Sequence, residues 1–149
     1  NSNLITYIQA ISSKFFYYGV TMFSHIVVGS NDAGASKRFY DATLIHLGYD
    51  EGHQMESGRT LYNYGKGVFF AFTPPLNGAP ATAANGGTIS FSAQTTEQVD
   101  AWHAAGLAAG GTECEDPPGI RDFGGAKMYI AYLRDPTGNK LAALHLIAD

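Results

Sequence analysis

The sequence of 149 residues predicts an α+β fold made of two copies of one βαβββ unit. The first observation is an internal repeat, in which five positions recur 63 residues later with the same or a similar residue. The second is that a β-rich run precedes a helical pattern in both halves. A repeat of this length indicates two fused units rather than a solenoid, and pockets favour the junction between such units. The matching pairs are Ile26 and Ile89, Phe39 and Trp102, Ala42 and Ala105, Leu44 and Leu107, and Gly48 and Gly111.

The first module is predicted to span residues 22–80. It opens with a short β-rich run, Phe23–Gly29, which predicts a strand. Asn31 and Asp32 follow with N-cap chemistry, so a helix should run from there to about Leu47. Gly48 stands where the end of a helix favours a left-handed residue. Three further strands are predicted around residues 51–56, 60–64 and 68–73.

The second module is predicted to span residues 86–149, after a linker rich in proline, glycine and asparagine. Thr88–Ala93 predicts its first strand, and Thr95 and Gln98 stand at capping-box spacing before a helix. Strands are predicted around residues 112–115, 128–134 and 140–147, with glycine-rich turns and loops between the first two. Asp135, Pro136, Thr137 and Gly138 suit successive positions of a type I turn before the last strand.

Residues 1–21 form an N-terminal extension, because Met22 has the character of an initiator and the repeat begins directly after it. The extension is either translated upstream sequence or a native segment. Leu4, Ile8, Ile11 and Phe15 have the spacing of an apolar helical stripe, which would let a native helix dock on the core.

Composition excludes several classes of function. Nine Lys and Arg residues against thirteen Asp and Glu give a formal charge of −4, which disfavours nucleic-acid binding. No run approaches the roughly 18 apolar residues of a membrane-spanning helix. The single cysteine, Cys114, excludes an intramolecular disulfide and fits a reducing compartment, so the cytoplasm is expected.

Three motifs resemble those of a known family. They are the opening Phe-Ser-His-Ile-Val-Val at residues 23–28, the aromatic pair Phe39 and Tyr40 in the first helix, and Tyr-Leu-Arg-Asp-Pro-Thr-Gly-Asn-Lys-Leu at residues 132–141. With the paired modules, they resemble the vicinal oxygen chelate superfamily over about residues 22–147. That superfamily includes glyoxalase I, extradiol dioxygenases, and fosfomycin- and bleomycin-resistance proteins. The resemblance implies a curled, cup-like mixed sheet with helices outside it, and a homodimer.

Family members hold a divalent metal at the floor of the cup, with ligands from the first and last strands of the modules. Of the four matching positions in this sequence, only His25 carries a ligand atom suited to that role. The other three positions hold Thr88, Ala142 and Phe70. A catalytic ion generally needs about three protein ligands. We therefore expect no cofactor, with Zn, Ni, Mn or Fe as the alternative.

Strand alternation predicts a ligand-binding wall in the cup. If Thr88 faces the cup, Ser90 and Ser92 do so too, while Ile89 and Phe91 face the helices. The same alternation adds Leu144, two residues after the ligand position Ala142, to the wall. It also adds Phe70, itself a ligand position, and Phe72, two residues after it.

Two polar side chains complete the candidate site. Tyr132 lies ten residues before Ala142, a spacing that resembles the placement of an active-site tyrosine in extradiol dioxygenases. It is therefore a catalytic candidate beside His25, although a tyrosine at this place also suits the core of a strand. Arg121, in a proline-rich loop, would contact an anionic ligand group or remain solvated.

These observations favour a metal-free protein that binds an aromatic or amphiphilic small molecule in the cup. The first alternative is a metal-dependent enzyme that resembles lactoylglutathione lyase or a dioxygenase, with His25 and non-standard ligands. The second is a metal-independent isomerase or lyase with His25 as general base. The sequence leaves these three functions open.

Overall fold

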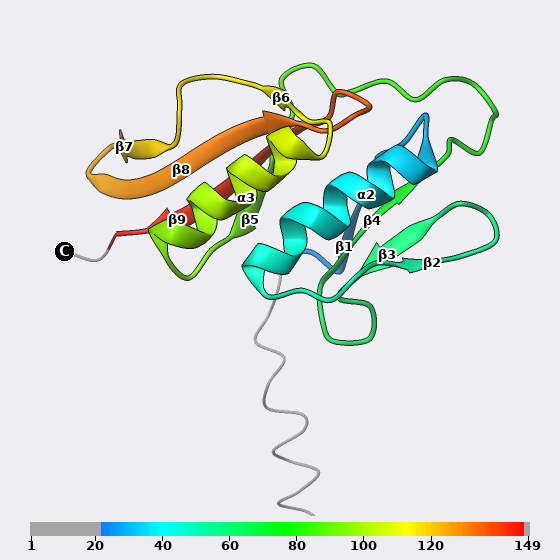
Figure 1. Cartoon of the computed structure of the whole chain (residues 1–149), viewed down its shortest axis with the longest axis horizontal. Helices are drawn as coiled ribbons and strands as arrows, with labels where there is room; N and C mark the ends of the chain where they lie inside the picture. The colour runs from blue at the N-terminus through cyan, green and yellow to red at the C-terminus, as the bar shows by residue number, and fades with distance from the viewer. Residues whose placement is uncertain (1–21, 148–149) are drawn as a thin grey trace, which may run out of the picture.

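A computed structural model describes residues 22–147, and the N-terminal extension lies outside the described residues. The first module contains strand β1 (His25–Gly29), helix α2 (Ala33–Leu44) and a short 3₁₀ helix, η1 (Ile45–Leu47), as Figure 1 shows. Strands β2 (His53–Gln54), β3 (Thr60–Tyr62) and β4 (Phe69–Thr73) follow. They form one sheet in the order β1-β4-β3-β2, in which only the β1–β4 pair is parallel.

The second module repeats this arrangement with one additional strand. It contains β5 (Ile89–Ser92), α3 (Thr96–Ala108), β6 (Thr112–Glu113), β7 (Gly119–Phe123), β8 (Ala126–Arg134) and β9 (Lys140–Leu146). Its sheet has the order β5-β9-β8-β6, and β7 also pairs with β8. The predicted α+β fold, with two mixed sheets, is therefore confirmed.

The prediction that Arg121 lies in a proline-rich loop was wrong, because β7 and the first residues of β8 form a hairpin there. The predicted glycine-rich turn is present and joins these two strands at Gly124 and Gly125. Glycines at positions 124 and 125 have positive φ angles of 69° and 100°, and Asp122 accepts a hydrogen bond from the amide of Gly125. The sequence did not predict this strand, because β7 contains polar residues and follows two prolines, a composition typical of a loop. It is an edge strand, which tolerates such a composition.

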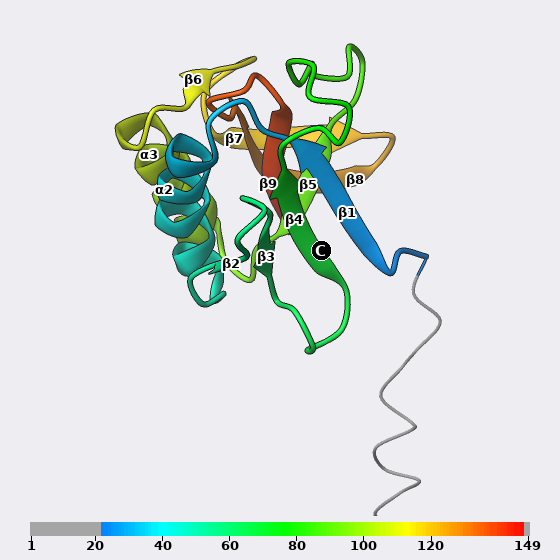
Figure 2. The same cartoon turned by 90° about the vertical axis from the view of Figure 1, so that its right-hand side faces the viewer.

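Both helices cover the same side of the two sheets, as Figures 1 and 2 show. They begin at the predicted caps, where Asp32 accepts from the amide of Ala35 and Thr95 accepts from the amide of Gln98. The repeat partners Phe39 and Trp102 are both fully buried in one core shared by the two modules. No helix within residues 22–147 is long and apolar enough to cross a bilayer.

Hydrogen bonds between the modules gather at one end of the molecule, on the turn that joins β8 and β9. Tyr40 donates to Asp135, the Asn31 amide donates to Thr137, and Asn139 donates to the Gly29 carbonyl. Strands β1 and β5 are each paired on one side only within the described part of the chain. Hydrogen bonds therefore join the two modules at this turn, and side-chain packing in the shared core joins them elsewhere.

Candidate functional site

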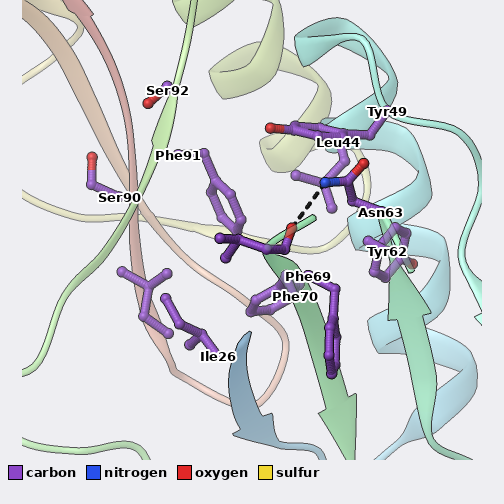
Figure 3. Close-up of a pocket in the computed structure, with 12 residues that line it drawn as sticks. Ile26, Leu44, Tyr49, Tyr62, Asn63, Phe69, Phe70, Ser90, Phe91 and Ser92 are labelled. Atoms are coloured by element: carbon purple, nitrogen blue, oxygen red, sulfur yellow. Dashed lines mark hydrogen bonds between the residues drawn. The ribbon is translucent and has the colours of Figure 1, made fainter. Parts of the chain in front are cut away.

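A cavity of about 190 Å³ lies between the two modules, and we call it the seam cavity (Figure 3). Its position agrees with the prediction that a pocket lies at the junction of the repeated units. The repeat partners Ile26 and Ile89 both line it, one from β1 and one from β5. The other lining residues are Leu44, Tyr49, Tyr62, Asn63, Val68, Phe69, Phe70, Ser90, Phe91 and Ser92.

Aromatic rings form one wall of the seam cavity. Phe91 of β5 meets Phe70 of β4 edge to face, with ring centroids 5.3 Å apart. Tyr62 of β3 lies 6.2 Å from Phe70, and the buried ring of Tyr40 supports Phe70 from behind at 4.8 Å. Such ring pairs are stabilised by more than the burial of their apolar area, so these rings hold one another in place. The wall is therefore an ordered surface on which a flat apolar ligand can pack.

The Tyr62 ring is held in that wall by a carboxylate outside the cavity. Its hydroxyl donates to Asp41 of α2 at 2.9 Å, and the same carboxylate oxygen accepts from the amide of Gly52 at 3.0 Å. Lys37 pairs with the other oxygen. Burial, and then the bond to Asp41, raise the pKa of Tyr62 above its usual value, so this phenol stays neutral.

A short loop closes another side of the seam cavity. The side-chain amide of Asn63 donates to the carbonyl of Val68 at 2.8 Å, and the Asn63 backbone has a positive φ of 60°. Figure 3 shows this bond beside Tyr49, whose hydroxyl points across the cavity toward β5. Tyr49 and Asn63 thus give the cavity a polar side next to Tyr62.

The β1–β4 register corrects the predicted wall in the first module. His25 pairs with Phe69, so Phe69 and Ala71 share its face, while Phe70 and Phe72 face the helices. Phe72 is fully buried and stacks on Tyr40 with centroids 5.6 Å apart. The prediction that Phe72 lines the cup was therefore wrong, because a shift of one residue moves a strand position to the opposite face. Phe70 reaches the seam cavity from the helix side.

The predicted faces of the second module are confirmed. Ser90 pairs with Ala142, which pairs with Tyr132, and Ser92 pairs with Leu144, so these residues share the helix-free face. Ile89 and Phe91 pack against the core as predicted. Figure 3 shows the hydroxyls of Ser90 and Ser92 turned away from Phe91. The two serines therefore border the seam cavity without aiming their hydroxyls at its centre.

The remaining predicted ligand residues lie away from the seam cavity. Thr88 precedes β5 and lines a separate hollow with Val27 and Lys140. The Lys140 ammonium lies 4.9 Å from the ring centre of Tyr132 and pairs with Glu115. Arg121 was predicted in a loop, but it lies in β7 and donates to the carbonyls of Pro117 and Ile120. Its guanidinium is thus bound by its own chain.

Comparison with known proteins shows the family to which the chain belongs. The family model of the Glyoxalase/Bleomycin resistance protein/Dioxygenase superfamily matches residues 22–143. The chain belongs to this superfamily. The resemblance predicted from the sequence motifs is therefore confirmed.

Solved structures agree with membership in the superfamily. A glyoxalase/bleomycin resistance protein from Albidiferax ferrireducens T118 is 54% identical, with a TM-score of 0.80 over 84% of this chain and 99% of that chain. A glyoxalase-related enzyme from Fulvimarina pelagi is 18% identical, with a TM-score of 0.62 over 84% of this chain and 88% of that one. At that identity, the likeness shows the fold alone. No curated protein matches the chain.

Superfamily members of the glyoxalase type imply a metal, but the residues found here do not fit one. His25 stacks on Phe69 with centroids 4.7 Å apart, and its Nδ1 lies 2.9 Å from the Ser24 hydroxyl. Within residues 22–147, no group of three or more His, Cys, Asp or Glu side chains is close enough to hold an ion. A lone imidazole beside a phenyl ring is not a donor set for a catalytic metal.

Sequence reasoning missed several residues of the seam cavity, among them Tyr49, Tyr62, Asn63, Phe69 and Phe91. In the sequence, most of them have the character of core or turn residues. A pocket between two modules is lined by apolar residues of the same kinds that fill a core, so the sequence does not distinguish the two. One signal was present in the repeat itself. Since Ile26 and Ile89 are repeat partners in first strands, the strand residues beside them were candidates for the junction.

Proposed function

We propose that this protein binds an aromatic or amphiphilic small molecule in the seam cavity, without a catalytic metal. The observation that carries the proposal is a cavity shared by the two modules and walled by the rings of Tyr62, Phe70 and Phe91. Apolar surface removed from water contributes roughly 25 cal/mol per Å² to binding. The lack of a metal donor set within the described residues supports binding over metal chemistry.

Titration of the purified protein with 2-naphthol, followed by chemical-shift changes or fluorescence, tests this proposal. Saturable binding should persist in excess EDTA. Phe91→Ala should weaken it by about 5- to 30-fold, because the ring forms part of the cavity wall. Phe91→Leu, which keeps an apolar side chain, should weaken it less and guards against a folding defect. Ile120→Ala removes an exposed apolar side chain outside the cavity and is the matched control.

The opposite results would support the enzymatic alternative. These are near-stoichiometric metal in untreated protein, loss of that metal in His25→Ala, and binding that requires the ion. Turnover of a substrate by metal-free protein, abolished in His25→Ala, would instead support a general-base enzyme. Either result would overturn the proposal of a binding protein.

We also propose a cytoplasmic homodimer. The helix-free faces of the sheets expose Val27, Phe123 and Leu146, which are 40%, 52% and 62% accessible in a single chain. Exposed apolar side chains on a sheet face favour association with another subunit. Sedimentation at micromolar concentration should give twice the mass of one chain, and a monomer at all concentrations would contradict the dimer.

A further inference from the structure

The seam cavity contains no charged lining residue. All twelve residues around it are apolar, aromatic, serine or asparagine, with no Asp, Glu, Lys, Arg or His among them. Asp41, which accepts from the hydroxyl of the lining residue Tyr62, is already bound by Gly52 and Lys37 as well. Asp50 and Lys66 line a neighbouring hollow that shares Tyr49 and Asn63, and they are paired with each other there. A ligand that carries a charge into this cavity would therefore lose its hydration without gaining a counter-ion.

The seam cavity nevertheless has polar groups with capacity for a ligand. The Tyr49 hydroxyl points across it and has no hydrogen-bond partner among the described residues, as Figure 3 illustrates. One N–H of the Asn63 side-chain amide is donated to the Val68 carbonyl, which leaves its second N–H as a donor and its carbonyl oxygen as an acceptor. Strand β5 contributes four lining residues and pairs only with β9 within residues 22–147. The N–H and C=O groups on its other edge are therefore available to hydrogen-bond a ligand. All these groups are neutral donors or acceptors.

The volume of the seam cavity suits a small aromatic group. An apolar cavity of about 150 Å³ is known to hold benzene. The seam cavity, at about 190 Å³, is slightly larger and is bordered by exposed Ser90 and Ser92. One aromatic ring or two fused rings therefore fit, with a substituent directed to the polar side.

We infer that the ligand of the seam cavity is an uncharged, flat aromatic molecule of one or two fused rings, with a hydroxyl, carbonyl or ring N–H that Tyr49 binds. This inference rests on the proposed function and narrows it, because it excludes anionic and cationic amphiphiles. The rings of Tyr62, Phe70 and Phe91 take the aromatic body. The Tyr49 hydroxyl, beside Asn63, selects the polar substituent.

Four naphthalene probes separate the parts of this inference at neutral pH. The neutral 2-naphthol should bind most tightly, and the anion 2-naphthoate and the cation 2-naphthylmethylammonium should bind at least about 10-fold more weakly. Naphthalene, which lacks the hydroxyl, should bind about 2- to 10-fold more weakly than 2-naphthol. Tyr49→Phe should abolish the advantage of 2-naphthol over naphthalene and leave naphthalene binding unchanged. Tyr64→Phe, an exposed tyrosine that does not line the seam cavity, should preserve that advantage.

The outcomes distinguish this inference from the proposed function. If a charged probe binds as tightly as 2-naphthol and Phe91→Ala weakens it, the cavity is a binding site but the neutral-ligand inference is wrong. An unchanged ratio of 2-naphthol to naphthalene affinity in Tyr49→Phe would equally refute the assigned role of Tyr49. If no probe binds, or if Phe91→Ala affects none of them, the proposed function itself fails.

Discussion

Tyr40 of α2 donates a hydrogen bond of 2.6 Å to Asp135 of the β8–β9 turn, and both side chains are buried. The two residues are 95 positions apart and belong to different modules. Asp135 also accepts from the backbone amides of Thr137 and Asn139 and from the Asn139 side chain, which in turn donates to the Gly29 carbonyl. The Asp-Pro-Thr-Gly-Asn motif, which helped to suggest the family, thus fastens the modules together.

Removing the Tyr40 hydroxyl should destabilise the protein by about 1.5–3 kcal/mol, because the bond is buried and its acceptor is charged. Tyr40→Phe changes nothing else in the side chain. Tyr129→Phe is a matched control, since Tyr129 donates to Asp100 at 2.8 Å in an exposed setting and should cost less than about 1 kcal/mol. Urea denaturation of the three proteins compares these losses. Equal losses in both variants would contradict a special role for the Tyr40 bond.

Stability should fall at alkaline pH because two tyrosines are held neutral in the folded protein. Burial raises the pKa of Tyr40, with a further contribution from Asp135, and burial also raises the pKa of Tyr62. In the unfolded chain both groups titrate near pH ~10. The folded protein then binds more protons than the unfolded one, so the stabilisation is present below that pH and is lost as the pH rises above it.

The free energy of unfolding should decline by up to about 2.7 kcal/mol per pH unit above pH ~10, from about 1.4 kcal/mol for each tyrosine. Denaturation at a series of pH values from neutral to alkaline measures this slope. The double variant Tyr40→Phe, Tyr62→Phe should be less stable at neutral pH and should show a shallower decline. A double variant with the same slope as the wild type would show that other groups dominate the alkaline transition.

Sequence reasoning found the fold because its signals are local or repeated. The caps Asp32 and Thr95 bind helix amides through contacts within a few residues, and the 63-residue repeat identified both first strands. The candidate site was harder to predict, because it depends on register. The sequence prediction put Phe70 on the same sheet face as His25, but the residue on that face is its neighbour Phe69. In a strand that is apolar throughout, no local pattern reveals such an error of one residue in register.

The contact between the two helices depends on Gly106. A Cβ atom at this position would lie 2.2 Å from the Leu133 side chain and 3.2 Å from those of Phe39 and Thr43. Gly106→Ala should therefore destabilise the protein by about 1–3 kcal/mol, although alanine is the better helix former. Gly34→Ala, in α2, meets no atom closer than 3.4 Å and should be neutral or stabilising by up to about 1 kcal/mol.

Thermal and urea denaturation of the two glycine variants test this difference. A stabilised Gly106→Ala protein would mean that the helices separate at little cost and that the close approach is not required. Loss of stability in both variants would point to a general intolerance of alanine in these helices instead.

Asn63 should control both the stability of the loop over the seam cavity and the affinity of the cavity. Its positive φ favours glycine or asparagine, and its amide holds the Val68 carbonyl. Asn63→Gly keeps the backbone conformation but removes the amide, whereas Asn63→Ala removes the amide and adds backbone strain. Asn63→Ala should therefore be less stable than Asn63→Gly by about 1 kcal/mol.

Binding should respond differently from stability. Both variants lose the bond that closes the loop, so both should bind 2-naphthol more weakly than the wild type, by about 2- to 10-fold. Titration of the folded variants well below their melting temperatures separates the two effects. Wild-type affinity in Asn63→Gly would show that the glycine alone shapes the loop and that the Asn63 amide contributes nothing to the cavity. A large difference in affinity between the variants would instead assign the effect to the backbone.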